Sequence, residues 1–207
     1  MNHALQKQRT RIQPCIVGVA ALVLAVSVAA AQARADEVVP PPVPAEIRVP
    51  EGNVAFMAGH AVGTQNYVCL PAGTGFKYTL FTPQATLFDG RSKEVTTHYF
   101  SPNPEEAGTV RATWQHSQDS SAVWGQAVQP STDSRFVAPG AIPWVLLKAK
   151  GHAAGPGGGN ALAGTTYIQR VNTTGGSAPA SGCSALADVG AQAFVPYTAD
   201  YVFFKGP

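Results

Sequence analysis

The stretch GTTYIQRVNTTGGSAPASGC, residues Gly164–Cys183, joins a strand pattern to a turn-rich segment that ends on a cysteine. Residues 165–172 are rich in β-branched and aromatic side chains, which are typical of β-strands. Small residues that favour turns then continue as far as Cys183. The stretch raises two questions: which residue Cys183 pairs with, and whether the segment serves chemistry or only holds a fold together.

The N-terminus resembles a targeting segment. Basic residues precede an apolar run, Ile16–Ala31, and the motif Ala33-Arg34-Ala35 fits a signal-peptidase site. A membrane anchor is the alternative, but a spanning helix needs about 20 apolar residues and this run is shorter. We therefore expect residues 1–35 to be a signal peptide that directs the protein to the periplasm or the extracellular space.

Two cysteines follow the predicted signal peptide, Cys69 and Cys183. In an oxidising compartment two such thiols usually pair, so we expect a disulfide that spans 183 − 69 = 114 residues. The alternatives are a reactive thiol or a metal ligand. Neither cysteine has a CxxC neighbour or a nearby histidine at ligand spacing, which favours the disulfide.

The rest of the chain predicts one all-β domain. Residues 36–50 are proline-rich and predict an extended lead-in. Residues 51–207 carry many short strand patterns separated by turn residues, which predict an antiparallel β-sandwich or a flattened β-barrel. Helical periodicity is nearly absent, and Ser184–Val189 is the best helical candidate. The two similar segments that begin at Ala85 and Ala112 fit two hairpins of one meander.

Charge argues against two classes of partner. Removal of residues 1–35 takes away four of 14 basic residues and no acidic one, which leaves 10 against 12 and a net charge of −2. The sequence has no basic stripe of the kind that binds nucleic acid. It also has no polybasic or amphipathic membrane segment, so we expect no stable membrane insertion after signal cleavage.

The common catalytic motifs are missing. The run GPGGGN lies in residues 152–164 and lacks the Lys-Ser/Thr of a phosphate loop. It also leads into a strand pattern rather than a helix, so we expect an exposed, mobile loop instead of a nucleotide site. No GxSxG, HExxH or HxH motif is present. We therefore predict no cofactor and no metal, although distant strands can build a metal site without a spacing signal.

Candidate site residues come from the predicted strands. A catalytic role would fall to His98, His116 and Arg170, although strand histidines are more often hydrogen-bonded to backbone. Arg170 is an isolated charge in its strand and is expected either in solvent or beside a carboxylate. Aromatic residues of an all-β domain mostly belong to the core, but they also line ligand clefts. The ligand-binding candidates are Tyr67, Trp114, Trp124, Tyr167, Gln169 and Arg170.

Five segments together resemble one family. They are GTQNYVC (Gly63–Cys69), TPQATLFD (Thr82–Asp89), AIPWVLLKA (Ala141–Ala149), GTTYIQRVNTTGGSAPASGC (Gly164–Cys183) and PYTADYVFFK (Pro196–Lys205). In these segments the chain resembles the secreted proteins grouped as domain of unknown function 3455 (DUF3455). The resemblance implies a secreted, β-rich domain and assigns no catalytic residue. Some members carry a malate dehydrogenase label, which this sequence does not support because it has no nucleotide fingerprint and no βαβ alternation.

Three hypotheses for function follow. The first is a non-catalytic ligand-binding or interaction module, with a small-molecule or cell-envelope ligand as its partner. The second is a secreted enzyme, metal-assisted or hydrolytic, that uses the strand histidines. The third is a structural envelope protein without a small ligand. Convergence of His98, His116 and Arg170 in one cleft would favour the second hypothesis.

Overall fold

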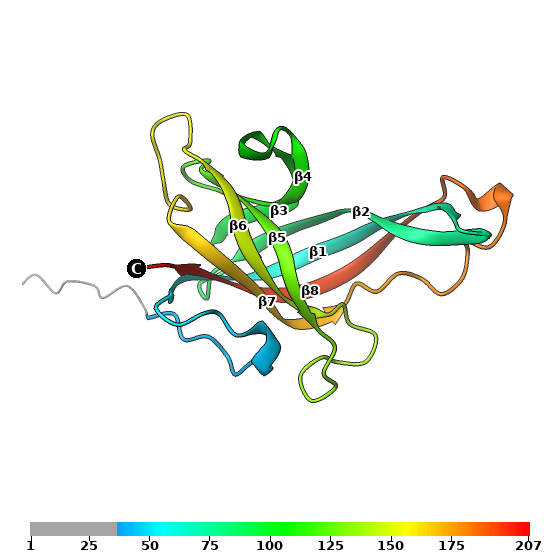
Figure 1. Cartoon of the computed structure of the whole chain (residues 1–207), viewed down its shortest axis with the longest axis horizontal. Helices are drawn as coiled ribbons and strands as arrows, with labels where there is room; N and C mark the ends of the chain where they lie inside the picture. The colour runs from blue at the N-terminus through cyan, green and yellow to red at the C-terminus, as the bar shows by residue number, and fades with distance from the viewer. Residues whose placement is uncertain (1–36) are drawn as a thin grey trace, which may run out of the picture. The chain divides into compact units, whose positions relative to one another are not determined.

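The computed structural model describes residues 37–207 (Figure 1). The predicted signal peptide, residues 1–35, lies outside the described residues. The described chain forms a closed barrel of eight antiparallel strands in which each strand pairs with its neighbours in sequence. The strands are β1 (Val54–Ala72), β2 (Gly75–Phe88), β3 (Glu94–Asn103), β4 (Thr109–His116), β5 (Ala122–Ser131), β6 (Trp144–Ala153), β7 (Thr165–Gly175) and β8 (Gln192–Lys205).

The prediction of an all-β fold is confirmed, and of the two forms expected it is the barrel that occurs. The paired hairpins β2–β3 and β4–β5 correspond to the two similar segments. Helical structure is limited to three short 3-10 turns, η1 (Ala45–Ile47), η2 (Pro104–Glu106) and η3 (Leu186–Asp188). No helix within residues 37–207 is long and apolar enough to cross a membrane.

Alternation along the strands fills the barrel. On β8, the residues Tyr197, Ala199, Tyr201 and Phe203 are buried and belong to the main core cluster. Successive side chains of a strand point to opposite faces, so this spacing places all four inside the barrel. The same cluster takes Leu87 from β2, Trp114 from β4, Val123 from β5 and Leu147 from β6.

Because neighbouring strands are antiparallel, the connections gather at two ends of the barrel. The closed end carries the β4–β5 turn (residues 117–121) and the β6–β7 loop (residues 154–164). Leu162 of that loop is fully buried in the barrel core. The Ala161 amide donates to Asp119 Oδ2 (2.9 Å) and the Leu162 amide to Ser121 Oγ (3.2 Å). The expectation of an exposed loop is therefore wrong at Leu162, which closes this end.

The proline-rich lead-in packs against the outside of the barrel. Ile47 is fully buried in a second cluster with Trp144 and Leu146 of β6 and Val171 of β7. Gln169 Nε2 donates to the Ile47 carbonyl at 2.7 Å. The strands of this part of the barrel are therefore buried on both faces. The side chains inside the barrel cover the inner face, and the lead-in covers the outer face.

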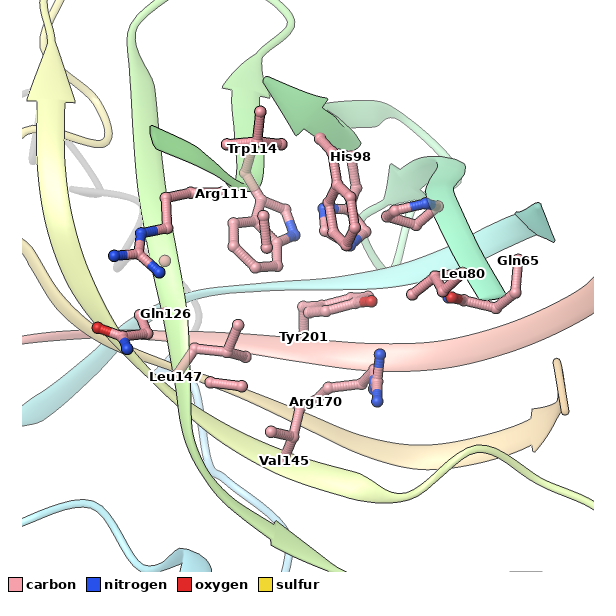
Figure 2. Close-up of a pocket in the computed structure, with 16 residues that line it drawn as sticks. Gln65, Leu80, His98, Arg111, Trp114, Gln126, Val145, Leu147, Arg170 and Tyr201 are labelled. Atoms are coloured by element: carbon pink, nitrogen blue, oxygen red, sulfur yellow. The ribbon is translucent and has the colours of Figure 1, made fainter. Parts of the chain in front are cut away.

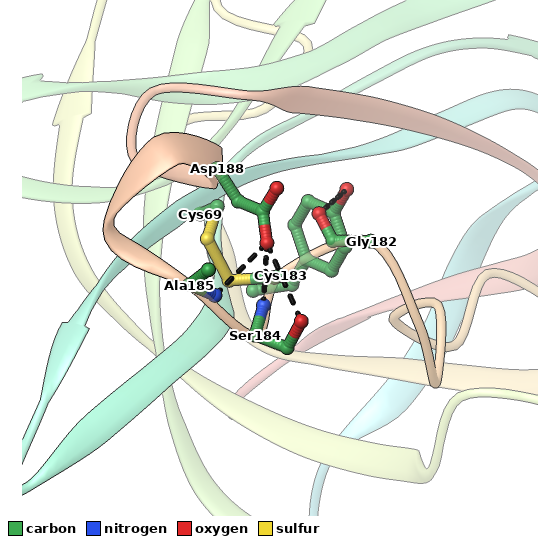
Figure 3. Close-up of a disulfide and its surroundings, with 7 residues drawn as sticks. Cys69, Gly182, Cys183, Ser184, Ala185 and Asp188 are labelled. Atoms are coloured by element: carbon green, nitrogen blue, oxygen red, sulfur yellow. Dashed lines mark hydrogen bonds between the residues drawn. A yellow bond between two sulfur atoms is a disulfide. The ribbon is translucent and has the colours of Figure 1, made fainter.

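Strands β1, β2 and β8 continue beyond the barrel and carry the loop of residues 176–191 beside them (Figure 1). The predicted disulfide is confirmed: Cys69 of β1 and Cys183 of this loop are bonded, with their Cα atoms 5.5 Å apart (Figure 3). Asp188 Oδ2 accepts from the amides of Ser184 (2.8 Å) and Ala185 (2.9 Å) next to the bridge. The disulfide thus ties a loop of small residues to the long strands.

Reduction of the Cys69–Cys183 bridge is expected to lower the free energy of unfolding by roughly 4–5 kcal/mol, because the unfolded chain loses a long covalent loop. Urea unfolding of the oxidised and the reduced wild type gives this difference without changing a side chain. The variant Cys69→Ala plus Cys183→Ala should match the reduced protein. An unchanged unfolding midpoint on reduction would contradict a stabilising role.

Gly63 of β1 lies directly against the backbone of β2. A Cβ atom added there would stand 2.1 Å from the Gln84 carbonyl oxygen and 2.6 Å from the Ala85 Cα atom. Because both are backbone atoms, Gly63→Ala must separate the two strands, at a cost of about 1–3 kcal/mol. Gly75→Ala is the matched control, since a Cβ at Gly75 meets no atom within 4 Å. Thermal unfolding of both variants tests this prediction, and equal melting temperatures would contradict it.

Candidate functional site

A pocket of about 460 Å³ enters the barrel at the end opposite Leu162 (Figure 2). We call this the pocket end; it carries the β3–β4 turn (residues 104–108) and the β5–β6 loop (residues 132–143). The walls are mostly apolar and include Leu80, Val110, Ala112, Val145 and Leu147. The polar residues that line the pocket are Gln65, His98, Arg111, Gln126, Arg170 and Tyr201.

Incomplete strand pairing opens the pocket. Strand β4 pairs with β5 only over Ala112–Gln115, so Val110 and Arg111 extend past the end of this ladder. Strand β2 pairs with β3 only from Ala85 onward, so its first half has no ladder on that side. Beyond these points the strands diverge, and their side chains surround the mouth of the pocket.

Aromatic rings form the inner wall. The rings of His98 and Trp114 are stacked, with centroids 4.2 Å apart and planes at 8°. Tyr201 lies 5.1 Å from the His98 ring and 5.4 Å from the Trp114 ring. His98 and Trp114 are direct cross-strand partners of β3 and β4, and this pairing brings their rings together.

His98 is held in its neutral form. Nδ1 lies 2.9 Å from the Thr113 carbonyl oxygen, and since a carbonyl only accepts, Nδ1 carries the proton and Nε2 is left as an acceptor. The pKa of His98 falls from 6.5 to about 3, mainly because the ring is buried; the bond to the Thr113 carbonyl opposes this fall, and the charge of Arg170 adds a smaller lowering. His98 therefore offers the pocket a hydrogen-bond acceptor at neutral pH.

Arg170 extends from β7 into the pocket (Figure 2). Its Nε and Nη2 atoms donate to a single acceptor, the Pro143 carbonyl oxygen, at 3.3 and 2.9 Å. Within residues 37–207 no carboxylate forms an ion pair with it. Neither of the two environments expected from the sequence occurs: Arg170 is half-buried in the pocket wall without an opposite charge.

The second arginine of the pocket is neutralised. Arg111 donates from Nε (2.8 Å) and Nη2 (3.0 Å) to the two carboxylate oxygens of Glu106. These bonds from Arg111 are the main reason that the pKa of Glu106 falls to about 2. Lys150 adds a weaker contact at 3.9 Å. The uncompensated positive charge of the pocket wall is therefore that of Arg170.

Two buried donors in the wall lack acceptors. Trp114 Nε1 and Gln65 Nε2 are both shielded from solvent and reach no hydrogen-bond partner within the described residues. Gln65 lies beside the Tyr197 hydroxyl, which in turn is 3.4 Å from that of Tyr201. Buried polar groups without partners are rare in native proteins, so each of these two needs an explanation.

Three of the predicted site residues line the pocket: His98, Trp114 and Arg170. His116 lies two residues further along β4, toward the closed end, and its Nδ1 is 2.9 Å from Asp119 Oδ1. The structure therefore brings His98 and Arg170 to one pocket but does not bring His116 there. No group of three or more metal-ligating side chains occurs between residues 37 and 207.

The other ligand-binding candidates lie elsewhere. Trp124 donates from Nε1 to Ser101 Oγ (2.9 Å), and Tyr67 donates from its hydroxyl to the Gly176 carbonyl (2.6 Å). Tyr167 packs against the outer cluster around Ile47, next to the contact of Gln169 with the lead-in. None of the four lines the pocket.

Two residues that line the pocket, Gln65 and Tyr201, are not among the ligand-binding candidates named from the sequence. The signal that could have identified Tyr201 is the two-residue alternation of a strand: Tyr201 is two residues from Phe203, and both side chains face the lumen. This alternation alone does not say which face of a strand is the inner one.

The lowered pKa of His98 predicts an acid-sensitive fold. The unfolded chain binds a proton near pH 6.5 and the native chain near pH 3, so stability falls as the pH drops between these values. From about pH 7 to about pH 5 this contributes a loss of roughly 2 kcal/mol. His98→Phe keeps a ring against Trp114 and should lose correspondingly less stability over that range.

Urea unfolding at the two pH values measures this difference. Acidic groups such as Glu106 are common to both proteins and cancel in the comparison. Equal losses in wild type and His98→Phe would contradict the prediction.

A comparison with protein-family models gives a match for the chain. The model described as "Protein of unknown function (DUF3455)" matches residues 50–205, which include every strand of the barrel and the disulfide. No curated protein and no solved structure matches the chain. The family match agrees with the resemblance found in five separate segments, and the chain belongs to the DUF3455 family.

Proposed function

We propose that this protein is a secreted, non-catalytic module that binds a small, largely apolar molecule in the pocket of its barrel. The observation that carries the proposal is the pocket itself. Its volume of about 460 Å³ falls in the range of natural small-molecule sites, roughly 300–1,000 Å³. Apolar walls with a few polar groups aimed inward are the usual composition of such sites.

The barrel type supports the same conclusion. Barrels of about eight strands have a lumen just wide enough to be filled by side chains or to hold one small ligand. Here Leu162 and Phe203 fill the lumen toward the closed end. At the pocket end the small residue Ala112 takes part in the wall and leaves space. The chain thus combines a packed half that supplies stability with a hollow half suited to a ligand.

Export is supported by two independent features. The Cys69–Cys183 disulfide is of a kind that persists in oxidising compartments. The N-terminal sequence has the pattern of a signal peptide, with a cut expected after Ala35. A ligand would therefore be encountered in the periplasm or outside the cell, as a free small molecule or a component of the envelope.

The enzyme hypotheses have less support. A metal-assisted or hydrolytic site built on His98 and His116 would need both side chains in one cleft, and His116 is engaged with Asp119 instead. Malate dehydrogenase activity would need a nucleotide crevice of the kind formed by βαβ units. A meander barrel has none, because its neighbouring strands are all antiparallel.

Binding of the neutral fluorescent probe N-phenyl-1-naphthylamine tests the proposal. We expect a rise in probe fluorescence with wild-type protein, because the pocket shields the probe from water. Ala127→Phe should weaken binding at least tenfold, since Ala127 lines the mouth of the pocket and is itself exposed, so the fold tolerates the ring.

Val128→Phe is the matched control. Val128 is the next residue, is 46% exposed and does not line the pocket, so the same ring there should leave binding unchanged. No fluorescence change with wild type would overturn the proposal, and so would equal binding by the two variants.

A further inference from the structure

We propose that the ligand of this pocket carries a carboxylate, which Arg170 binds while the apolar walls hold the rest of the molecule. This inference rests on the proposed function, because it names the chemical class of the molecule that the pocket would take. It follows from the donors that Arg170 leaves free, from the charges of the wall, and from the buried donors around it.

Arg170 has free donors in a suitable geometry. A guanidinium carries five N–H groups in a planar fork, and the two bonds to the Pro143 carbonyl leave three of them. Those three belong to Nη1 and Nη2, and the edge between these two atoms matches the two oxygens of a carboxylate. The contact with Pro143 fixes the guanidinium in place and leaves this edge unused.

Charge selects an anion with a single negative charge. None of the sixteen residues that line the pocket is aspartate or glutamate, and the charge of Arg111 is balanced by Glu106. One uncompensated guanidinium therefore remains, and one carboxylate neutralises it. A phosphate would bring close to two negative charges at neutral pH and would leave about one of them unpaired.

Burial makes the unpaired state unfavourable. A half-buried charge that has a single carbonyl acceptor loses hydration without gaining a counter-ion. The charge of Arg170 acts on the groups around it: it adds to the lowering of the His98 pKa that burial causes, and it partly opposes the rise that burial causes in the pKa of the Tyr67 and Tyr197 hydroxyls. A carboxylate in the pocket would remove the imbalance.

Two other polar groups of the wall agree with an acceptor-rich ligand. Gln65 Nε2 and Trp114 Nε1 are both donors without an acceptor. An ionised carboxylate has only acceptors, with room for about four hydrogen bonds on its two oxygens. A neutral amine or an ammonium group would instead bring further donors, and an ammonium would be repelled by Arg170.

A pair of ligands with nearly the same shape tests the inference. We would measure displacement of N-phenyl-1-naphthylamine by 2-naphthoate and by its neutral analogue, 2-naphthamide. Wild-type protein should prefer the carboxylate by about tenfold or more, as expected of a charge-assisted hydrogen bond. Arg170→Met should remove this preference and leave the affinity for 2-naphthamide within about twofold.

Two further variants make the result specific. Lys148→Met removes the same charge from an exposed position of β6 that does not line the pocket, and it should keep the preference. Arg170→Lys keeps the positive charge but not the planar set of donors, so it should keep part of the preference for the carboxylate. It replaces Arg170→Met in the experiment if circular dichroism shows that Arg170→Met does not fold. 2-Naphthyl phosphate provides the competing anion.

The outcomes separate this inference from the proposed function. If the neutral probe binds but 2-naphthoate has no preference over 2-naphthamide, or the preference survives Arg170→Met, the carboxylate inference is overturned and the binding pocket stands. Tighter binding of 2-naphthyl phosphate than of 2-naphthoate overturns it as well. If no probe binds wild-type protein, the proposed function itself fails.

Discussion

The pairing of β1 with β8 is the constraint on which the rest of this structure depends. The register runs from Val54 opposite Lys205 to Val68 opposite Gln192, so the first and last strands close the sheet on itself. Closure converts the alternation along each strand into an inside and an outside. Residues far apart in sequence, such as His98 and Arg170, then face one lumen. The disulfide at Cys69 lies on the continuation of this same pair of strands, where it secures a loop and leaves closure to the ladder.

The two ends of the lumen differ in what they do. Toward the closed end, Leu162 and Phe203 fill the lumen, and Asp119 fastens the loop that carries Leu162. Toward the pocket end the strands diverge and the wall contains unpaired donors. Because the packed half already provides a core, side chains at the pocket end are free to be polar at a tolerable cost in stability. This division of the lumen explains how a small barrel can carry an unneutralised arginine.

Much of the fold was predictable because its signals are local. Strand composition, turn residues and the two cysteines were enough for the all-β fold and the disulfide. The pocket was only partly predictable from the sequence. Where a strand is buried on both faces, its residue pattern does not show which face points into the barrel. Gln169 and Arg170 are neighbours on β7, yet Gln169 lies outside under the lead-in and Arg170 lies inside. Both are ligand-binding candidates from the sequence, and only closure of the barrel and docking of residues 37–50 separate them. The burial of Leu162 was likewise hidden by the glycine-rich loop around it.

The position of Arg170 is difficult to explain by stability alone. Its two hydrogen bonds to Pro143 help to hold the β5–β6 loop, but a neutral donor would make the same contact without placing a charge in an apolar wall. An arginine at this position becomes favourable when an anion neutralises its charge. Because the guanidinium is already fixed, it binds the anion without further loss of side-chain freedom. The packing around it points the same way: His98 stays neutral beside it, Arg111 is neutralised elsewhere, and no acid lines the wall. The residues around Arg170 are thus arranged to leave one positive charge available.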